Sequence, residues 1–422
     1  MFTSLPIPVS MPGSVIILHH LKTFSMESRV KLGILLVVAS GILLFVNLVA
    51  ANVCGWIAEA FFLSFFSTTF RLAPHWRLLL VSTANLISSF ILSVFIAHGR
   101  VSLAMGDSIT MAVILWFTSC ISLILVVLFP VPATDPLQGK YKCIGTSSLI
   151  VPGVGSKDLH IQVWYPVREE STDSWWRSSR STIWTSGNPA HQIDEINHLI
   201  TGMARTYGLP STILSHLTFG MSNAAWNISC DDVLTAQTTN ITFPVAIYSH
   251  GMYGWKQVHT SACEALASSG FVVIGVDHDP DCMMFRPVGS PHSSRYFDYD
   301  LPEGLSVKEE REFYSKGMDR RASDIIRVID VVSSQDELRT LCPALAGRLD
   351  VESVHLWGHS FGGGTVATVC CRDYRVRSAV LLDSWMYPVP DEDRRTGSLS
   401  AELLVLSAGR WKYGKVRSNS IL

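Results

Sequence analysis

The stretch Val354–Cys371, VHLWGHSFGGGTVATVCC, decides the fold. It begins with an apolar run that contains residue types favoured in strands. Residues 361–371 are mostly small and lack proline, which predicts a buried helix. Between the two, Gly358, Ser360 and Gly362 form a G-x-S-x-G motif. A strand, a sharp turn and a helix in this order are typical of a serine nucleophile.

The central residue of the motif, Ser360, is the predicted nucleophile. The sharp turn forces it into a strained backbone conformation that holds its hydroxyl above the sheet edge, at the positive end of the following helix. Gly358 and Gly362 are expected because a Cβ atom at either position would collide with neighbouring backbone. The alternative is an ordinary glycine-rich turn.

Strands alternate with helices on both sides of this stretch. This alternation predicts an α/β fold, a mostly parallel sheet flanked by helices. Strands are predicted at residues 158–165, 244–249, 271–276, 354–357, 378–382 and 403–406, and helices at 258–269, 308–333 and 361–371. The helix over 308–333 has one apolar face, and Arg320, Arg321 and Arg327 are expected on its other faces.

A serine hydroxyl needs an orienting acid, oxyanion donors and a base. Asp383 is the predicted acid because it ends a buried strand 23 residues after Ser360, although an aspartate here could instead cap a helix. The acidic residues at 391–393 are expected in a solvated loop. One oxyanion donor is the amide of Phe361, and the loop 250–254, HGMYG, is positioned to supply the other unless it is an ordinary turn.

The expected base is missing from the sequence after Asp383, because residues 384–422 contain no histidine. His250 and His278 follow strand ends and therefore lie near the active edge, where a role in supporting loops is favoured. His359 adjoins the serine, and neighbouring side chains diverge at such a turn.

Four segments carry a family resemblance: YSHGMYGW at 248–255, SSGFVVIGVDHD at 268–279, GHSFGGGT at 358–365 and LLDSWMYP at 381–388. They resemble the platelet-activating factor acetylhydrolases, also described as lipoprotein-associated or group VII phospholipases. The resemblance covers roughly residues 141–413 and is most specific in the last two segments.

The resemblance implies an α/β-hydrolase with Ser360 as nucleophile, Asp383 as triad acid, and the amides of Met252 and Phe361 as oxyanion hole. It implies an esterase that needs neither metal nor cofactor and releases short or oxidised acyl groups from the sn-2 position of phospholipids. The family's triad histidine follows the strand matched here by residues 403–406. The stretch Gly409–Leu422 departs from the family and has no histidine, so the domain is expected to be C-terminally incomplete and barely active. The alternative function is a non-catalytic, membrane lipid-binding or regulatory pseudo-hydrolase.

Composition separates the N-terminal third from the rest. The 422 residues are 48% apolar and only 16% charged. Runs long and apolar enough to suggest membrane spans occur at residues 32–53, 78–96 and 109–128, with a weaker one at 54–70. The expected order is a leader at 1–31, a transmembrane domain of three or four helices at 32–130, a linker at 131–142 and a hydrolase domain at 143–422.

This organisation predicts a multi-pass integral membrane protein with the bilayer and a phospholipid as partners. Four spans would place the hydrolase domain on the cytoplasmic side and three on the other side, a choice that the sequence leaves open. The net charge of −2 gives no indication of a nucleic-acid partner. The nine cysteines contain no C-x-x-C pair, so no zinc site is expected.

Overall fold

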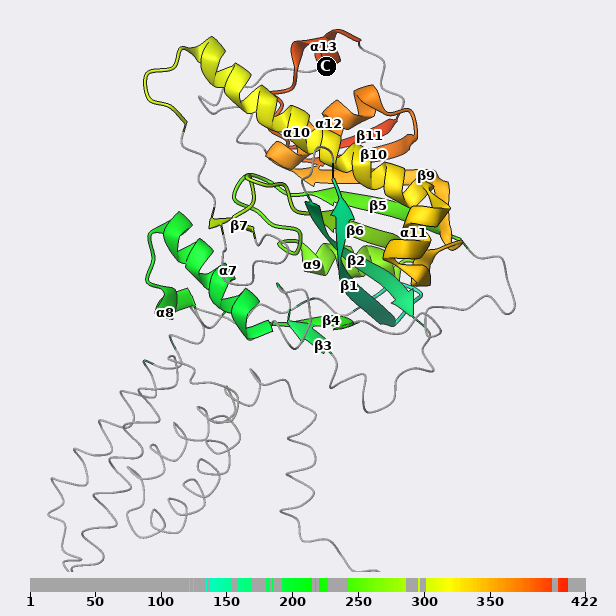
Figure 1. Cartoon of the computed structure of the whole chain (residues 1–422). Helices are drawn as coiled ribbons and strands as arrows, with labels where there is room; N and C mark the ends of the chain where they lie inside the picture. The colour runs from blue at the N-terminus through cyan, green and yellow to red at the C-terminus, as the bar shows by residue number, and fades with distance from the viewer. Residues whose placement is uncertain are drawn as a thin grey trace, which may run out of the picture. The chain divides into compact units, whose positions relative to one another are not determined.

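The computed structural model describes residues 137–153, 158–167, 180–182, 192–214, 220–226, 242–285, 295–296, 301–396 and 401–408, together with a few single positions. The chain forms two compact units, residues 1–131 with 215–217, and residues 132–214 with 218–422. Every helix and strand named below belongs to the second unit (Figure 1).

A nine-stranded sheet forms the centre of the second unit, in the order β11-β10-β9-β5-β6-β2-β1-β4-β3. Its strands are β1 (Cys143–Pro152), β2 (Asp158–Val167), β3 (Arg180–Thr182), β4 (Met221–Trp226), β5 (Phe243–Ser249), β6 (Val272–Val276), β9 (Leu349–His359), β10 (Val376–Leu382) and β11 (Glu402–Leu406). Strands β6, β5, β9, β10 and β11 run parallel, and β2 lies antiparallel to both β6 and β1. A short separate ribbon pairs β7 (Met284–Phe285) with β8 (Arg295–Tyr296).

Helices cover both faces of the sheet. They are α7 (Gln192–Tyr207), α8 (Ser211–Leu214), α9 (Thr260–Ser268), α10 (Val307–Ser333), α11 (Gln335–Leu341), the 3-10 helix η4 (Pro343–Leu345), α12 (Phe361–Arg372) and α13 (Asp391–Thr396). Helices α10 and α12 pack on one face, and α9 packs on the other. The predicted α/β-hydrolase architecture is therefore confirmed.

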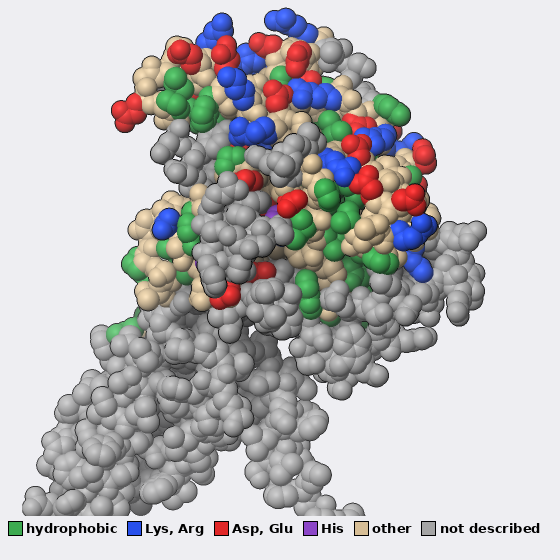
Figure 2. Space-filling view, in the orientation of Figure 1, with side chains coloured by type: hydrophobic (Ala, Val, Ile, Leu, Met, Phe, Trp, Pro, Cys, Tyr) green, Lys and Arg blue, Asp and Glu red, His purple; other side chains and the backbone are tan. Residues whose placement is uncertain are grey.

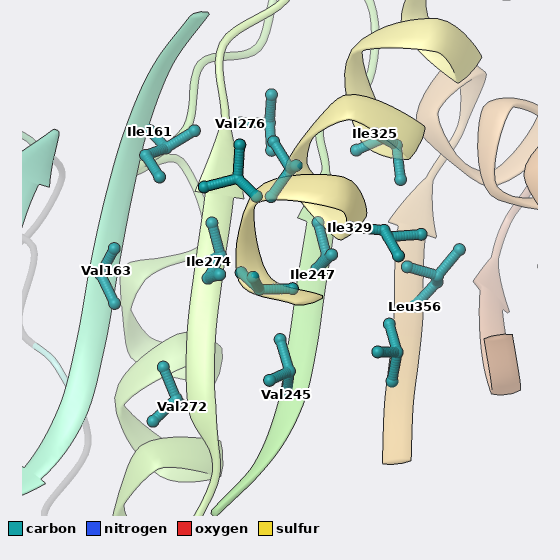
Figure 3. Packing of buried hydrophobic residues seen from close by; sticks show 14 of the residues in the cluster. Ile161, Val163, Val245, Ile247, Val272, Ile274, Val276, Ile325, Ile329 and Leu356 are labelled. Atoms are coloured by element: carbon teal, nitrogen blue, oxygen red, sulfur yellow. The ribbon is translucent and has the colours of Figure 1, made fainter. Parts of the chain in front are cut away.

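The alternation of side chains along each strand builds the two cores. Val245 and Ile247 of β5 face α10, where they meet Ile325 and Ile329 (Figure 3). The intervening Ala246 and Tyr248 belong to the cluster under α9. Because successive residues of a strand point to opposite faces, an apolar run with no polar interruption is what a strand covered on both faces requires.

The predicted elements are present, and most of their boundaries shift by one or two residues. One difference is larger, because strand β9 begins at Leu349, five residues before the predicted strand. Strand β2 also continues through Pro166, where the sequence predicted its end. This is possible because β6 pairs with β2 only over Ile161–Trp164, so the proline lies where β2 has one neighbouring strand.

The predicted transmembrane bundle and multi-pass membrane localisation require correction. Across the described residues, no helix combines the length and the apolar character needed to cross a bilayer. The four predicted spans, at residues 32–53, 54–70, 78–96 and 109–128, lie outside the described residues apart from isolated positions 121 and 124.

Candidate active site

Backbone strain is concentrated where the sequence predicts the site. In the described chain, three non-glycine residues have a positive φ: Tyr253 at 61°, Ser360 at 54° and Asp383 at 45°. They follow the carboxyl ends of β5, β9 and β10, neighbouring strands of the sheet. Such backbone conformations cost about 1–3 kcal/mol each and persist only where the surrounding structure enforces them.

Ser360 lies at the turn between β9 and α12, with φ 54° and ψ −120°. Its backbone is fixed from both sides. The Ser360 amide donates to the Leu382 carbonyl at 3.0 Å, and the Ser360 carbonyl accepts from the Gly363 amide at 3.0 Å and the Trp385 amide at 2.9 Å. The hydroxyl makes no side-chain capping bond to α12. The strained turn predicted from the G-x-S-x-G motif is present.

Glycines of the motif allow the backbones to approach closely. A Cβ atom on Gly358 would lie 2.3 Å from the Gly362 carbonyl oxygen, and one on Gly362 would lie 2.2 Å from that of Ser249. The predicted collisions are thus confirmed. The next residue also needs to be glycine, since a Cβ on Gly363 would lie 1.9 Å from the Ser384 hydroxyl oxygen. The absence of a Cβ atom at Gly363 lets the loop after β10 pack against the start of α12.

Asp383 follows β10 and is held by the end of β11. Its amide donates to the Leu406 carbonyl at 2.6 Å, and its Oδ1 accepts from the Ala408 amide at 2.8 Å. The alternative role as a helix cap is wrong, because the next helix, α13, begins only at Asp391. The stretch expected as a solvated loop is this helix, and Asp393 within it is buried.

The loop after β5 packs beside the serine. A Cβ atom on Gly251 would lie 3.4 Å from Ser360 Cβ. The loop turns sharply, with the Gly254 amide donating to the Gly251 carbonyl at 3.1 Å. Met252 packs against the cluster that contains Phe361. The structure therefore brings together the predicted nucleophile, both predicted oxyanion donors and, through the contacts of the loop after β10, the predicted acid.

A buried ion pair anchors the same loop to β6. Lys256 donates its amide to Asp277 Oδ1 at 2.7 Å and its Nζ to Asp277 Oδ2 at 2.5 Å. Burial alone would raise the pKa of Asp277, but the Lys256 charge and hydrogen bonds lower it below its usual value. The carboxylate therefore stays ionised. Sequence reasoning missed this pair because its members lie 21 positions apart, in no recognisable spacing.

His250 is engaged by backbone on both sides of its ring. Its Nε2 accepts from the His278 amide at 3.3 Å, so its Nδ1 carries the proton and donates to the Gly251 carbonyl at 2.7 Å. Burial, followed by the charge of Arg321, lowers the pKa of His250 well below its usual value. The imidazole is neutral, and neither nitrogen is free to accept a proton from Ser360.

His278 forms a chain that resembles a catalytic triad. Its Nδ1 donates to Asp324 Oδ2 at 2.9 Å, and its Nε2 lies 3.0 Å from the Ser249 hydroxyl, which donates to it. Burial, followed by the Arg321 charge, lowers the pKa of His278 well below its usual value. Ser249 is 0% exposed, so no substrate reaches it. The supporting role predicted for both histidines agrees with these contacts.

Acidic residues gather at one further place in the described residues, where a metal could be considered. Asp319, Glu392 and Asp393 bring their carboxylates together. Arg372 already occupies this cluster, with Nη2 at 2.7 Å from Asp319, 3.5 Å from Glu392 and 2.7 Å from Asp393. On the face seen in Figure 2, basic and acidic side chains are similarly interspersed over α10 and α13.

Comparison with known proteins places the chain in a family. The family model described as "Platelet-activating factor acetylhydrolase, isoform II" matches residues 136–418. The chain belongs to this family. The match confirms the resemblance stated from the four sequence segments. It also covers every described strand of the sheet.

Curated relatives agree with the family model. The platelet-activating factor acetylhydrolases of Gallus gallus and Bos taurus are 25% and 28% identical to the chain, over 40% of the chain in each case. A putative phospholipase A2 of Schizosaccharomyces pombe is 27% identical over 36% of the chain. The alignments cover 45%, 39% and 42% of these relatives, so the chain matches less than half of their length.

A search of solved structures finds a ferulic acid esterase from Streptomyces cinnamoneus. It is 18% identical, has a TM-score of 0.47, and the match covers 67% of this chain and 69% of the esterase.

Proposed function

We propose that this chain is a serine ester hydrolase that removes a short or oxidised acyl group from the sn-2 position of a phospholipid. One observation carries the proposal. The described residues with strained, positive-φ backbone outside glycine are Tyr253, Ser360 and Asp383, and all three lie at one edge of the sheet. Family membership supports the substrate class.

In the proposed reaction, the Ser360 hydroxyl attacks the ester carbonyl, and its proton passes to a base. The amides of Met252 and Phe361 stabilise the negative charge that develops on the carbonyl oxygen. The lysophospholipid leaves as an alcohol after taking up the proton, and water then hydrolyses the acyl-serine ester. Asp383 orients the base and stabilises its charged form. None of these steps uses a metal or a cofactor.

Aromatic side chains beside the serine support an apolar substrate. Trp385 packs against Tyr314 and Phe361, with ring centroids 4.8 Å and 5.8 Å away. The Trp385 amide also donates to the Ser360 carbonyl, which fixes the aromatic cluster next to the proposed nucleophile. Burial of apolar surface in such a cluster favours an acyl chain over a charged group.

The alternative is a non-catalytic protein that binds phospholipid without hydrolysing it. One observation favours it: among the described residues, no histidine donates to or accepts from the side chains of Ser360 or Asp383. In this alternative the turn at Ser360 and the loops beside it serve as a lipid-binding surface only.

Labelling and turnover together test the two functions. A fluorophosphonate probe should label wild type but not Ser360→Ala, while Ser323→Ala, on the exposed side of α10, should label normally. Wild type should also release acetate from an acetyl phospholipid faster than palmitate from its long-chain analogue. Labelling without turnover would favour the lipid-binding alternative, and equal labelling of wild type and Ser360→Ala would exclude Ser360 as the nucleophile.

A further inference from the structure

Arg321 is a buried cation beneath the proposed site. It lies in the middle of α10 and is 1% exposed. Its Nη1 donates to the His250 carbonyl at 2.6 Å, and its Nε donates to Asp281 Oδ2 at 2.9 Å. Its guanidinium carbon lies 4.7 Å from the centre of the Phe361 ring. The sequence pattern placed this arginine away from the apolar face of the helix, which is wrong.

These contacts converge on the two segments that carry the proposed oxyanion donors. The His250 carbonyl belongs to the peptide unit before Gly251, directly ahead of Met252. The Phe361 ring belongs to the second donor itself. We propose that Arg321 is a positioning residue that holds the backbones of Met252 and Phe361 in the geometry of the oxyanion hole, a role that rests on the function proposed above.

The chemistry of the contact explains why an arginine is needed. A planar guanidinium reaches an acceptor on one side, a carboxylate on another and an aromatic face at the same time, which the point charge of lysine cannot do. Asp281, 2% exposed, neutralises the charge so that it can be buried. A buried ion pair that only filled space could be replaced, both partners together, by apolar residues of similar volume with little loss of stability.

The most direct test is Arg321→Lys, which keeps the positive charge and loses the planar guanidinium with its several N–H donors. Displacing a catalytic group by about 1 Å can cost about 10²-fold in rate, so we expect kcat to fall by about 10–100-fold with KM nearly unchanged. The KM is expected to hold because the oxyanion exists only in the transition state. Amide hydrogen exchange at Met252 and Phe361 should become faster by about tenfold, which measures positioning without any turnover.

Arg375→Lys is the matched control. Arg375 pairs with Asp373 at 2.6 Å and with Asp330 at 2.7 Å. It therefore has two ionic partners, and one of them lies on α10, the helix that carries Arg321. It lies just before the start of β10, whereas Asp383 follows the other end of that strand. The control should therefore leave kcat, KM and the exchange of both amides unchanged. The melting temperature of each variant shows that it is folded at the assay temperature.

The outcomes separate this proposal from the proposed function. Faster exchange together with a lower kcat in Arg321→Lys, and neither in Arg375→Lys, supports the positioning role. A folded Arg321→Lys with wild-type exchange or wild-type kcat overturns it, while Ser360-dependent turnover still stands. If wild type shows no Ser360-dependent labelling or turnover, the proposed function fails, and the oxyanion role of Arg321 fails with it. If Arg321→Lys does not fold, Asp281→Ala, which removes both the charge and the acceptor that hold Arg321, is measured in the same way and decided by the same outcomes.

Discussion

Two pairs of neighbouring strands end at the same edge of the sheet, and the polar residues that follow them differ in backbone strain and in hydrogen bonding. After β9 and β10, Ser360 and Asp383 lie in strained backbone, and the Ser360 hydroxyl makes no capping bond. After β5 and β6, His250 and His278 are fully buried, and each ring nitrogen has a hydrogen-bond partner. We call the loops after β9 and β10 the elbow edge, and the loops after β5 and β6 the supporting edge.

The difference shows which residues remain available for chemistry. Buried polar groups must be hydrogen-bonded, and once both nitrogens of an imidazole are engaged it can neither give nor take a proton readily. Strain, by contrast, is retained only where surrounding contacts enforce it. The supporting edge therefore supplies rigidity together with one proposed oxyanion donor, Met252, and the elbow edge supplies the proposed nucleophile and acid.

The largest expected difference in kcat is between a substitution of Asp383 on the elbow edge and one of Asp324, the carboxylate on α10 that bonds His278 of the supporting edge. Asp383→Asn should lower kcat for the acetyl ester by more than about tenfold, because an amide cannot stabilise a charged base. Its stability should change by less than about 1 kcal/mol, since asparagine tolerates positive φ and its oxygen can still accept from Ala408. Asp324→Ala should instead cost about 1–3 kcal/mol of stability, because it removes the acceptor of the His278 Nδ1 proton, with kcat within tenfold of wild type. Similar kinetic losses in both variants would remove the distinction between the edges.

Gly362→Ala should disrupt the place where the two edges touch. The added Cβ would lie 2.2 Å from the Ser249 carbonyl oxygen and 2.6 Å from that of His250. Backbone cannot yield as a flexible side chain does, so we expect a loss of about 3 kcal/mol in denaturant unfolding. Gly208→Ala is the control, because Gly208 has a φ of 63° but open space around it. Its loss should be about 1 kcal/mol, from backbone strain alone.

Acid should destabilise the protein through its histidines. Burial, then the His359 charge, lowers the pKa of His259 to about 4 from 6.5. Between pH 6.5 and about 4 the unfolded chain binds more protons at His259 than the folded chain does. The contribution of neutral His259 to stability is therefore complete above pH 6.5 and is lost as the pH falls. Glu264 acts in the opposite direction because burial raises its pKa. The measurement is therefore the difference between wild type and His259→Phe.

His259→Phe retains a ring stacked on Tyr248 and removes one titrating group. Its unfolding free energy should fall less than that of wild type between pH 7 and 5, by up to about 1.4 kcal/mol per pH unit. Identical pH profiles would show that His259 titrates in the folded protein as it does in the unfolded chain.

The smallest effect is expected at the start of α10. Ser306 caps this helix in a capping box with Glu309. Ser306→Ala should cost about 1 kcal/mol in unfolding experiments without changing kcat. Ser323→Ala, whose hydroxyl bonds only to the preceding turn of the helix, should stay within about 0.5 kcal/mol of wild type. A kinetic effect of Ser306→Ala would mean that the position of the whole helix, and not Arg321 alone, controls the site.

Local patterns in the sequence predicted the elbow edge well. The strand before Ser360, the glycines and the buried strand before Asp383 are contiguous signals, and each is decided by neighbours within a few positions. The family match then confirmed the resemblance that these segments carry. The role of each site residue remains a prediction.

The supporting edge could not be predicted in the same way. Arg321 bonds the His250 carbonyl across 71 positions, and His278 meets Asp324 across 46. An arginine in an amphipathic helix is normally solvated, so only the packed structure reveals one that is buried. The sequence pattern did not predict strands β1, β3 and β4, because β1 and β4 contain several polar or small residues and β3 has only three residues.

The pairing of β5 with β9 joins Phe243 to Leu349, and the Asp383 amide reaches forward to Leu406. Parallel pairings between distant segments form slowly, because a long loop must close before any contact is gained. The order of synthesis adds to this delay, since the ribosome must reach Leu406 before Asp383 can adopt its final backbone conformation. The rate at which Ser360 becomes reactive toward a covalent probe would therefore report when β5, β9 and β10 have paired during folding.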